Sequence, residues 1–350
     1  MAFQTLRISN LRNITQLEIA PAEGINLIYG KNGSGKTSLL ESIFMLGRGR
    51  SFRSSRAAPL ICTGKKSLEI YGEYCANDTL NKIGIRKTLS DTEIHLNGEN
   101  IHRLSQLAVT VPLQILTPQS YQLLDRGPEY RRKFIEWGVF HVEHQYSELL
   151  KRFLRAMNQR NAALKSNQKI ARAWDKEVAD CGELINSKRE RYFGQLNTLL
   201  ENELKCFMPD LEFDIVWRRG WKAGLTLSDS LIQNFERDCE RKFTGSGPQR
   251  ADIEIRINKI PVSQYASRGQ QKLLVAALCI AQLKLSRQIT DRKSVLLVDD
   301  LAAELDSHNR EMLFSRFKES GSQVFLTATD PQLLSGMVDS MFHVEHGSLA

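Results

Sequence analysis

Two short stretches of the sequence carry residue types that could bind and cleave a phosphate chain. The first, GKNGSGKT, fits the pattern G-x-x-x-x-G-K-[ST] between an apolar strand-like stretch and a helical one, which is the context of a phosphate-binding P-loop. Backbone N–H groups and the helix dipole hold the α- and β-phosphates in such a loop, the lysine reaches the β- and γ-phosphates, and the hydroxyl holds Mg²⁺. The loop residues are Gly30, Lys31, Asn32, Gly33, Ser34, Gly35, Lys36 and Thr37.

The second stretch, VLLVDD, is an apolar run that ends in two carboxylates, Asp299 and Asp300. We expect Asp299 to bind Mg²⁺ directly or through water, and Asp300 to orient or deprotonate the attacking water. A buried strand that ends in an acidic turn is common in α/β proteins, so the pair becomes informative only beside the P-loop. Together the two motifs predict an ATP and Mg²⁺ site whose γ-phosphate remains open to solvent.

A third stretch, SRGQQKLLVAAL, places Ser267 and Gly269 just before an apolar helical run. Small residues at a helix start suit an anion. We expect this helix start to lie on the far side of its lobe, out of reach of the ATP bound to the same chain. A second copy related by a two-fold axis would bring Ser267 and Gly269 to that ATP. The sequence therefore predicts an ATP-dependent homodimer with two nucleotides between the chains.

Composition narrows the class of protein. The chain has 350 residues, of which 41% are hydrophobic and 25% charged, as in a soluble globular protein with one large domain and a second lobe. No apolar run has the length of a membrane span, the N-terminus lacks a signal-peptide pattern, and the six cysteines show no C-x-x-C pair. We therefore expect a cytoplasmic protein without a membrane partner. A net charge of +8 favours an anionic partner such as nucleic acid, although many soluble proteins are mildly basic.

The apolar periodicities predict how the chain is organised. Strands are expected within 3–30, a helix over 37–47, a β-rich patch over 67–116, long charged helices over about 120–240, and alternating strands and helices from 251 onward. TGSGP, at 244–248, reads as a break. The predicted fold class is α/β, with a mostly parallel sheet and an antiparallel β patch. The core would comprise 1–120 and 245–350, and a mainly helical second lobe would comprise 121–244.

The set of motifs resembles the ABC-type ATPase heads of the SMC class. It comprises GKNGSGKT, SRGQQK and VLLVDD, together with ELD at 304–306 and TPQS at 117–120. Within that class the chain resembles the bacterial RecF family, through stretches that run from residue 7 to about 310. These stretches include NGSGKTSLLESI, LGRGRSFR, GPEYRRKFIEWGVFH, GPQRADI and DDLAAELD.

The resemblance implies roles for further residues. Arg12 and Asn13 would lie near the adenine and ribose, and Gln119 would sense Mg²⁺ and the attacking water. Ser267 and Gly269 would contact the partner's γ-phosphate, and Asp306 would cross the dimer interface. The helical lobe would be inserted between the Q-loop at Gln119 and the signature motif at Ser267.

The resemblance also implies a biological role. It is that of a recombination mediator that recognises gapped duplex–single-strand DNA and helps load RecA, together with RecR and RecO, in DNA repair, replication restart and the SOS response. Two departures from the usual ABC pattern imply slow, DNA-stimulated ATP hydrolysis that serves as a clamp or switch. Asp300 stands where a glutamate is usual, and TAT at 327–329 supplies no switch histidine.

Two basic runs are candidates for DNA contact. GRGRSFRSSR, at 47–56, holds Arg48, Arg50, Arg53 and Arg56 and no acid. Residues 151–172, which include Arg152 and Arg155, also contain no acid and predict a helix face of one sign. Either run could instead be a solvated surface. Few aromatic residues are interleaved with these charges, so contact with the duplex backbone is favoured over base stacking.

Two other classes of protein are weighed against this reading. The nucleotide-binding subunit of an ABC transporter is disfavoured because 148 residues separate Gln119 from Ser267, where a transporter subunit has a compact helical subdomain of well under a hundred. The missing histidine argues in the same direction. A structural DNA-binding protein without a cofactor is disfavoured by the P-loop.

Overall fold

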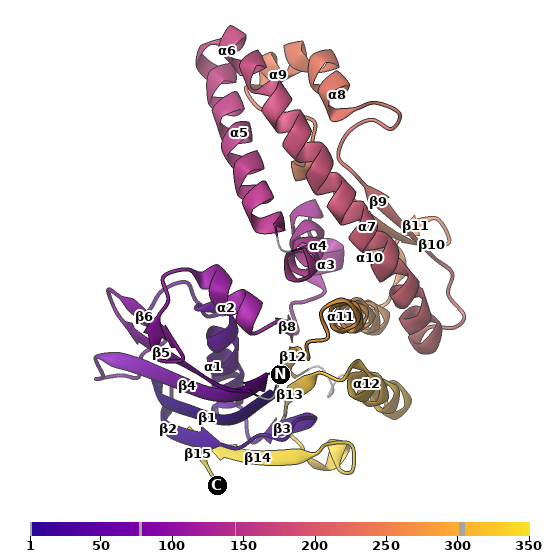
Figure 1. Ribbon diagram of the computed structural model, residues 1–350. Helices are drawn as coiled ribbons and strands as arrows, with labels where there is room; N and C mark the ends of the chain where they lie inside the picture. The colour runs from indigo at the N-terminus through magenta and orange to yellow at the C-terminus, as the bar shows by residue number, and fades with distance from the viewer. Residues whose placement is uncertain (1, 77–78, 144, 301–304) are drawn as a thin grey trace. The chain divides into compact units, whose positions relative to one another are not determined.

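The structure, a computed structural model, describes residues 2–76, 79–143, 145–300 and 305–350 (Figure 1). Contacts between Cα atoms divide the chain into two compact units. The first unit comprises the chain up to Ser120 together with Ala276–Ala350, and the second unit comprises Tyr121–Val275.

The first unit contains two six-stranded sheets. The antiparallel sheet has the strand order β2-β1-β4-β5-β6-β7, and the other sheet has the order β15-β14-β3-β13-β12-β8. The antiparallel sheet is formed by β1 (Ala2–Leu11), β2 (Ile14–Ile19), β4 (Ser67–Ala76), β5 (Thr79–Thr88), β6 (Thr92–Leu96) and β7 (Glu99–Asn100). The other is formed by β3 (Ile25–Tyr29), β8 (Leu113–Leu116), β12 (Val295–Val298), β13 (Gln323–Ala328), β14 (Ser340–Glu345) and β15 (Ser348–Leu349).

The second of these sheets is parallel except at β15, which pairs antiparallel with β14. Buried residues fill every position of β12 and β13, as expected for strands covered on both faces. The helices described in this unit are α1 (Lys36–Arg48), α2 (Leu104–Thr110), α12 (Ser307–Ser320) and the C-terminal part of α11 (Arg268–Thr290). The predicted α/β class, with a mostly parallel sheet and an antiparallel β patch, is therefore confirmed.

One hydrophobic core joins the two sheets of the first unit through α1. Phe3 and Ile8 from the antiparallel sheet, Leu40 and Ile43 from α1, and Phe325 from β13 all belong to it and are fully buried. Removing such side chains from water supplies the main driving force for packing α1 in this position. The core fixes α1, and with it the loop that precedes α1, relative to both sheets.

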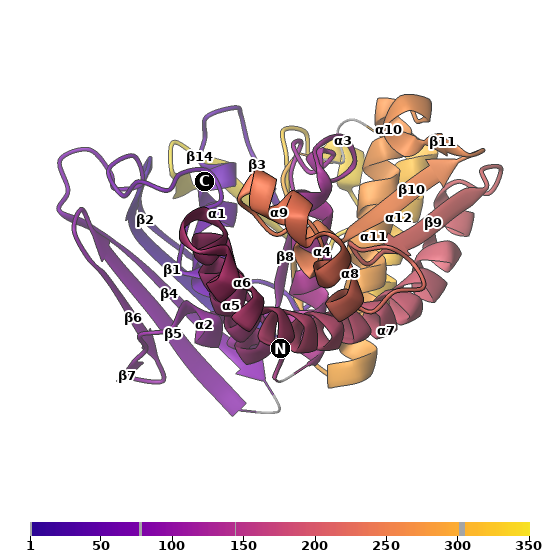
Figure 2. The same cartoon turned by 90° about the horizontal axis from the view of Figure 1, so that it is seen from above.

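The second unit is mainly helical, as predicted. Its long helices are α5 (Tyr146–Ser166) and α7 (Asp175–Phe207), which has 33 residues and is therefore about 50 Å long. Its shorter helices are α3 (Gln122–Asp125), α4 (Pro128–Val142), α6 (Gln168–Ala173), α8 (Leu227–Gln233), α9 (Phe235–Arg241) and α10 (Val262–Tyr265). A three-stranded antiparallel sheet has the order β11-β10-β9, with β9 (Phe213–Arg218), β10 (Asp252–Ile257) and β11 (Ile260–Pro261). Figure 2 shows β9 and β10 side by side next to α7.

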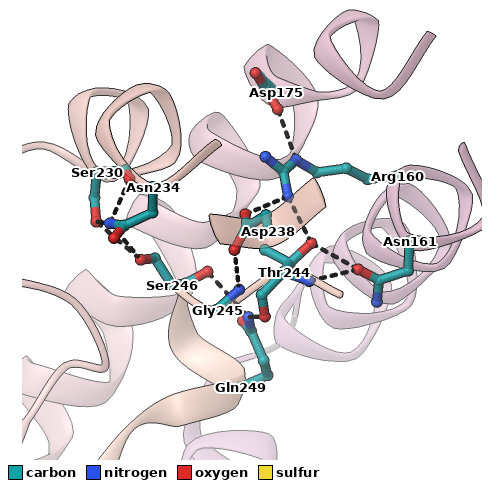
Figure 3. A network of polar contacts seen from close by, with 10 residues as sticks. All are labelled: Arg160, Asn161, Asp175, Ser230, Asn234, Asp238, Thr244, Gly245, Ser246 and Gln249. Carbon is teal, nitrogen blue, oxygen red and sulfur yellow. Dashed lines mark hydrogen bonds and ion pairs between the residues drawn. The ribbon is translucent and has the colours of Figure 1, made fainter. Parts of the chain in front are cut away.

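The predicted break at 244–248 is ordered by a buried polar network (Figure 3). Arg160 is fully buried and donates to Asp175 (2.6 Å), Asp238 (2.7 Å) and Thr244 (2.9 Å). Asn161 Oδ1 accepts from both the N–H and the hydroxyl of Thr244. The segment is therefore held by side chains of α5 and α9, where the glycine-rich sequence alone predicted only a loop.

The second boundary between the units differs from the predicted one. The expected division fell between residues 244 and 245, but residues up to Val275 group with the second unit. The physical reason is the pairing of β10: it forms six residue pairs with β9, and its Asp252 forms an ion pair with Arg131 of α4 at 2.7 Å. The first boundary, between Ser120 and Tyr121, coincides with the predicted one.

One helix among the described residues is long and apolar enough to cross a membrane by length and composition. It is α11, whose most apolar window has a mean hydropathy of 1.3, and 72% of that window is buried inside the protein. The expectation that no apolar stretch has this length is therefore corrected. Burial of this kind is typical of a core helix.

Candidate nucleotide-binding site

The phosphate loop lies between β3 and α1, as its sequence context predicts. Gly30 has a φ of 150°, and a Cβ at this position would lie 2.2 Å from the carbonyl oxygen of Val344. Only glycine fits such a conformation and such a close approach. The loop is thereby held directly at the carboxyl end of the sheet, the edge at which α/β proteins bind ligands.

Lys36 is buried, with 8% of its surface exposed, and its ammonium group points back onto the loop. It donates to the carbonyl oxygens of Gly30 (2.7 Å) and Lys31 (3.0 Å). Burial lowers the pKa of Lys36, while the charges of Asp300 and Asp299 raise it. Ser34 Oγ is also buried and has no hydrogen-bond partner within the described protein. A loop with a buried cation and an unsatisfied hydroxyl fits an anionic group.

The two carboxylates at the end of β12 face the start of α1. Asp299 Oδ1 accepts a hydrogen bond from Thr37 Oγ1 at 3.1 Å, so the predicted Mg²⁺ ligands Thr37 and Asp299 are brought together. Asp300 follows with a φ of 52°. The pKa of Asp300 is raised by burial and by the neighbouring Asp299, and Lys36 opposes this increase. A carboxyl group with a raised pKa is a better proton acceptor than an ordinary aspartate.

Thr327 also lines the cleft that these groups form, although its sequence motif did not predict a role for its hydroxyl group. It lies near the end of β13, the strand between β3 and β12, and it is buried. Its hydroxyl donates to Asp299 Oδ1 at 2.8 Å and accepts from the Asp300 N–H at 3.0 Å. The motif TAT at 327–329 indicated only that an imidazole is missing. Its position at the end of an apolar strand was the available signal.

These groups line one cleft of about 420 Å³ in the first unit, a volume in the range of small-molecule sites. The described residues that line it are Arg12, Asn13, Asn32, Gly33, Gly35, Lys36, Thr37, Ser38, Arg53, Pro118, Asp299, Asp300 and Thr327. Hard oxygen ligands and a P-loop are the donor set that Mg²⁺ and a triphosphate require. The residues present therefore fit both groups.

Arg12 and Asn13 line the cleft, but their side chains already have protein partners. Arg12 binds Glu41 through Nε and Nη2. Asn13 Nδ2 donates to the carbonyl oxygens of Gly33 and Ser34 at 3.2 and 3.0 Å. The side chain of Asn13 thus braces the loop and that of Arg12 binds α1, while their expected position near adenine and ribose stays a prediction.

Gln119 lies at the end of the segment that follows β8, is exposed, and is not among the residues that line the described cleft, although Pro118 is. Ser267 and Gly269 lie in the second unit, at the start of α11. Ser267 Oγ accepts from the Gln270 N–H, and Gln270 Oε1 accepts from the Ser267 N–H, which is a capping box. Asp306 caps α12 by accepting from the Asn309 N–H. Glu304 lies outside the described residues.

The four arginines of the first basic run differ in exposure. Arg50, Arg53 and Arg56 are exposed, and Arg53 lines the cleft described above. Arg48 is different, because its side chain donates to the carbonyl oxygen of Leu113 at 2.9 Å and burial lowers its pKa to about 10. Its guanidinium group anchors the end of α1, so Arg48 is a weaker candidate for DNA contact than the three exposed arginines, and its assignment stays a prediction.

The sequence of the second basic run predicted a helix face of one sign, but in the structure acidic residues neutralise part of it. Arg152 is paired through two nitrogens with Glu177 of α7, and Arg160 is buried. The acids that neutralise them lie on neighbouring helices, where a count along one helix does not find them. Arg155 remains exposed.

A P-loop after β3 and paired acids after β12 of the same sheet define a P-loop nucleotide-binding head. The family model described as "RecF/RecN/SMC N terminal domain" matches residues 2–348. The "DNA replication and repair protein RecF" of Shewanella woodyi is 41% identical over 99% of this chain and 97% of its own length. The protein of the same description from Shewanella piezotolerans is 40% identical over 99% and 98%.

Solved structures agree with this class. A RecF–ATP structure, described as the recombination mediator protein in the RecFOR pathway, has a TM-score of 0.87 at 24% identity and covers 100% of this chain and 97% of its own. The Smc head domain from Pyrococcus furiosus has a TM-score of 0.65 at 15% identity, with 99% and 95% covered. These two matches show the fold. The chain belongs to the RecF family, which decides against the transporter subunit.

Proposed function

We propose that the chain is an ATP-dependent, DNA-binding recombination mediator that uses slow ATP hydrolysis as a switch. The observation that carries this proposal is the meeting of Thr37, Asp299 and Asp300 in one cleft beside the buried ammonium group of Lys36. This is the constellation with which P-loop proteins bind ATP and Mg²⁺ and activate water. The names of the relatives, which are DNA replication and repair proteins, support the cellular role.

Each residue has a role that follows from its position. Backbone N–H groups of Gly33 to Thr37 would hold the phosphate chain, and Lys36 would exchange its loop carbonyls for phosphate oxygens. Thr37 and Asp299 would hold Mg²⁺, which when bound neutralises phosphate charge. Asp300 would accept the proton of the attacking water, an assignment favoured by the raised pKa of Asp300. The role of Gln119 rests on the family resemblance alone, because it does not line the described cleft; there it would complete the water site.

The signature residues support a site that is shared between two copies of the chain. Gly269 lies within a helix, has no positive φ, and a Cβ there would meet only Ser267 Oγ, at 4.0 Å. Nothing described within the chain requires a glycine at this position, and glycine costs helix stability. A close approach by the phosphates of a partner's ATP explains why glycine is present. Ser267 and Gly269 would therefore complete the site of the second copy, and Asp306 would lie at the interface.

The DNA-facing role rests on exposed charge. Arg53 lines the nucleotide cleft, Arg50 and Arg56 are exposed on the same run, and Arg155 is exposed on α5. Closure of the dimer on ATP would complete a surface for duplex or gapped DNA, and hydrolysis would open it. The family role supports action in the cytoplasm with RecR and RecO to load RecA, without a membrane partner.

Mass measurement in solution tests this proposal. With ATP and Mg²⁺, the wild-type protein should become a dimer, and Lys36→Ala should abolish both ATP binding and dimerisation. Ser267→Arg should still bind ATP as a monomer but should fail to dimerise. A wild-type protein that stays monomeric at saturating ATP and Mg²⁺, with or without gapped duplex, contradicts the shared site. Loss of monomeric ATP binding in Ser267→Arg would contradict the assignment of Ser267 to the partner's nucleotide.

A further inference from the structure

Glu41 is a buried carboxylate whose role the motifs do not explain. It lies on α1 one helical turn after Thr37, between Leu40 and Ser42, and 0% of it is exposed. Burying an ionised carboxylate is costly unless it is paired and hydrogen-bonded. The hydrogen-bond partners of the Glu41 carboxylate therefore indicate its role.

The first partner of Glu41 is Arg12. The guanidinium group of Arg12 contacts both carboxylate oxygens, through Nε to Oε2 and through Nη2 to Oε1, the latter at 2.9 Å. The hydrogen bond to Glu41 raises the pKa of Arg12. Arg12 adopts a φ of 53°, a conformation that a bulky residue keeps only when its surroundings hold it. The bidentate pair supplies that restraint for the turn between β1 and β2.

The second partner of Glu41 is Ser51, which belongs to the basic run after α1. Ser51 Oγ donates to Glu41 Oε1. Ser51 Oγ in turn accepts hydrogen bonds from the N–H groups of Arg53 and Ser54, both at 2.9 Å. Ser51 thus transmits the position of Glu41 to the backbone of Arg53, a residue that lines the nucleotide cleft.

Both segments held by Glu41 border the same cleft. Arg12 and Asn13 line one part of it and Arg53 another, together with the P-loop. Asn13 also binds the P-loop through the carbonyl oxygens of Gly33 and Ser34. One carboxylate on the P-loop helix therefore connects the helix, the β1–β2 turn and the basic loop. We propose that Glu41, acting through Arg12 and Ser51, is a positioning residue that pre-organises the walls of the nucleotide cleft.

This inference rests on the proposed nucleotide site and assigns to Glu41 the role of holding the walls of that site in place. Pre-organisation lowers the ordering cost of binding, so loosening the walls should weaken nucleotide affinity more than it slows the chemical step. A residue that only stabilised the fold would lower the unfolding temperature and leave nucleotide affinity unchanged in the folded protein. The two roles are therefore separable by measurement.

The test uses the full-length protein and four variants. Ser51→Ala removes the link to the loop, and Glu41→Gln removes the charge that holds Arg12. Ser54→Ala is the matched control, because Ser54 lies on the same loop but its hydroxyl bonds to Arg56 and not to Glu41. Ser51→Thr keeps a hydroxyl and is the rescue variant. ATP affinity is measured with a fluorescent ATP analogue, the KM and kcat of ATP hydrolysis are measured in parallel, and thermal unfolding is recorded.

The expected result is a loss of ATP affinity and a rise in KM on the order of 10-fold in Ser51→Ala and Glu41→Gln, as for other supporting-shell residues, with a smaller change in kcat. Ser54→Ala and Ser51→Thr should bind ATP as the wild type does. Wild-type affinity in Ser51→Ala, or an equal loss in Ser54→Ala, would overturn the inference. If Glu41→Gln does not fold, the serine variants still decide. Failure of the wild type itself to bind ATP would instead reject the proposed nucleotide site.

Discussion

The hydroxyl of Thr327 donates a 2.8 Å hydrogen bond to Asp299 Oδ1, the oxygen that also accepts from Thr37. The same hydroxyl accepts from the N–H of Asp300. Thr327 therefore fixes both acidic residues at the end of β12 from the neighbouring strand. Its place in the sheet, between the P-loop strand and the acidic strand, makes this contact available without any loop movement.

Replacing Thr327 with valine should slow ATP hydrolysis. Valine keeps the size of threonine but removes the hydroxyl, so Asp299 and Asp300 would lose their common partner. We expect a loss on the order of 10-fold in kcat, with ATP binding largely retained because Lys36 and the loop are unchanged. Steady-state hydrolysis and nucleotide titration measure the two effects. Thr329→Val is the control, since Thr329 is exposed and lies just beyond β13; an equal loss there would argue against the assigned role of Thr327.

The exposed arginines after α1 should contribute to DNA affinity, whereas Arg48 should not. Replacing Arg50 and Arg56 with alanine removes two charges and should weaken duplex binding. The slope of log K against log salt concentration should become shallower by roughly 2. Arg48→Met is the matched control, because its guanidinium group is buried and binds the carbonyl oxygen of Leu113. Binding isotherms at several salt concentrations test this. A salt slope that becomes shallower in Arg48→Met but not in the double variant would indicate that Arg48, and not Arg50 and Arg56, contacts DNA.

On α5, the exposed Arg155 and Lys151 are better candidates for DNA contact than Arg152. Arg152 already pairs with Glu177 through two nitrogens, so its charge is compensated. Alanine at Lys151 and Arg155 should lower duplex affinity and the salt slope together. Arg152→Ala should have a smaller effect on both. Equal effects from all three positions would indicate that the pair opens when DNA binds.

Breaking the buried network in the second unit should destabilise it strongly. Arg160→Met leaves Asp238, whose side chain is 2% exposed, without its ion-pair partner. Removal of one partner from a buried pair costs about 3–5 kcal/mol. Thermal and urea unfolding measure the loss, and Arg155→Met on the same helix is the exposed control. Stability unchanged by Arg160→Met would mean that water satisfies Asp238 and Thr244 in the variant.

Local motifs predicted the α/β fold and the contact between the P-loop and the acids after β12, because each motif is confined to a few adjacent residues. The P-loop, the apolar run that precedes Asp299 and the β-rich patch that contains β4, β5 and β6 are examples. Partners distant in sequence were not predictable. Glu177 opposite Arg152, Glu41 beneath Arg12 and the strand partner of β10 all depend on tertiary packing, which apolar periodicity along one segment does not encode.

The strand that leads into the P-loop obtains both of its neighbours from the far end of the chain. In the sheet, β3 lies between β13 and β14, which occupy residues 323–345. During synthesis, β3 therefore stays unpaired on both edges until residues 323–345 have been made. A chain released before this point would lack both neighbours of β3 and could not form the nucleotide site. Its unpaired apolar strand would be a target for chaperones and proteases.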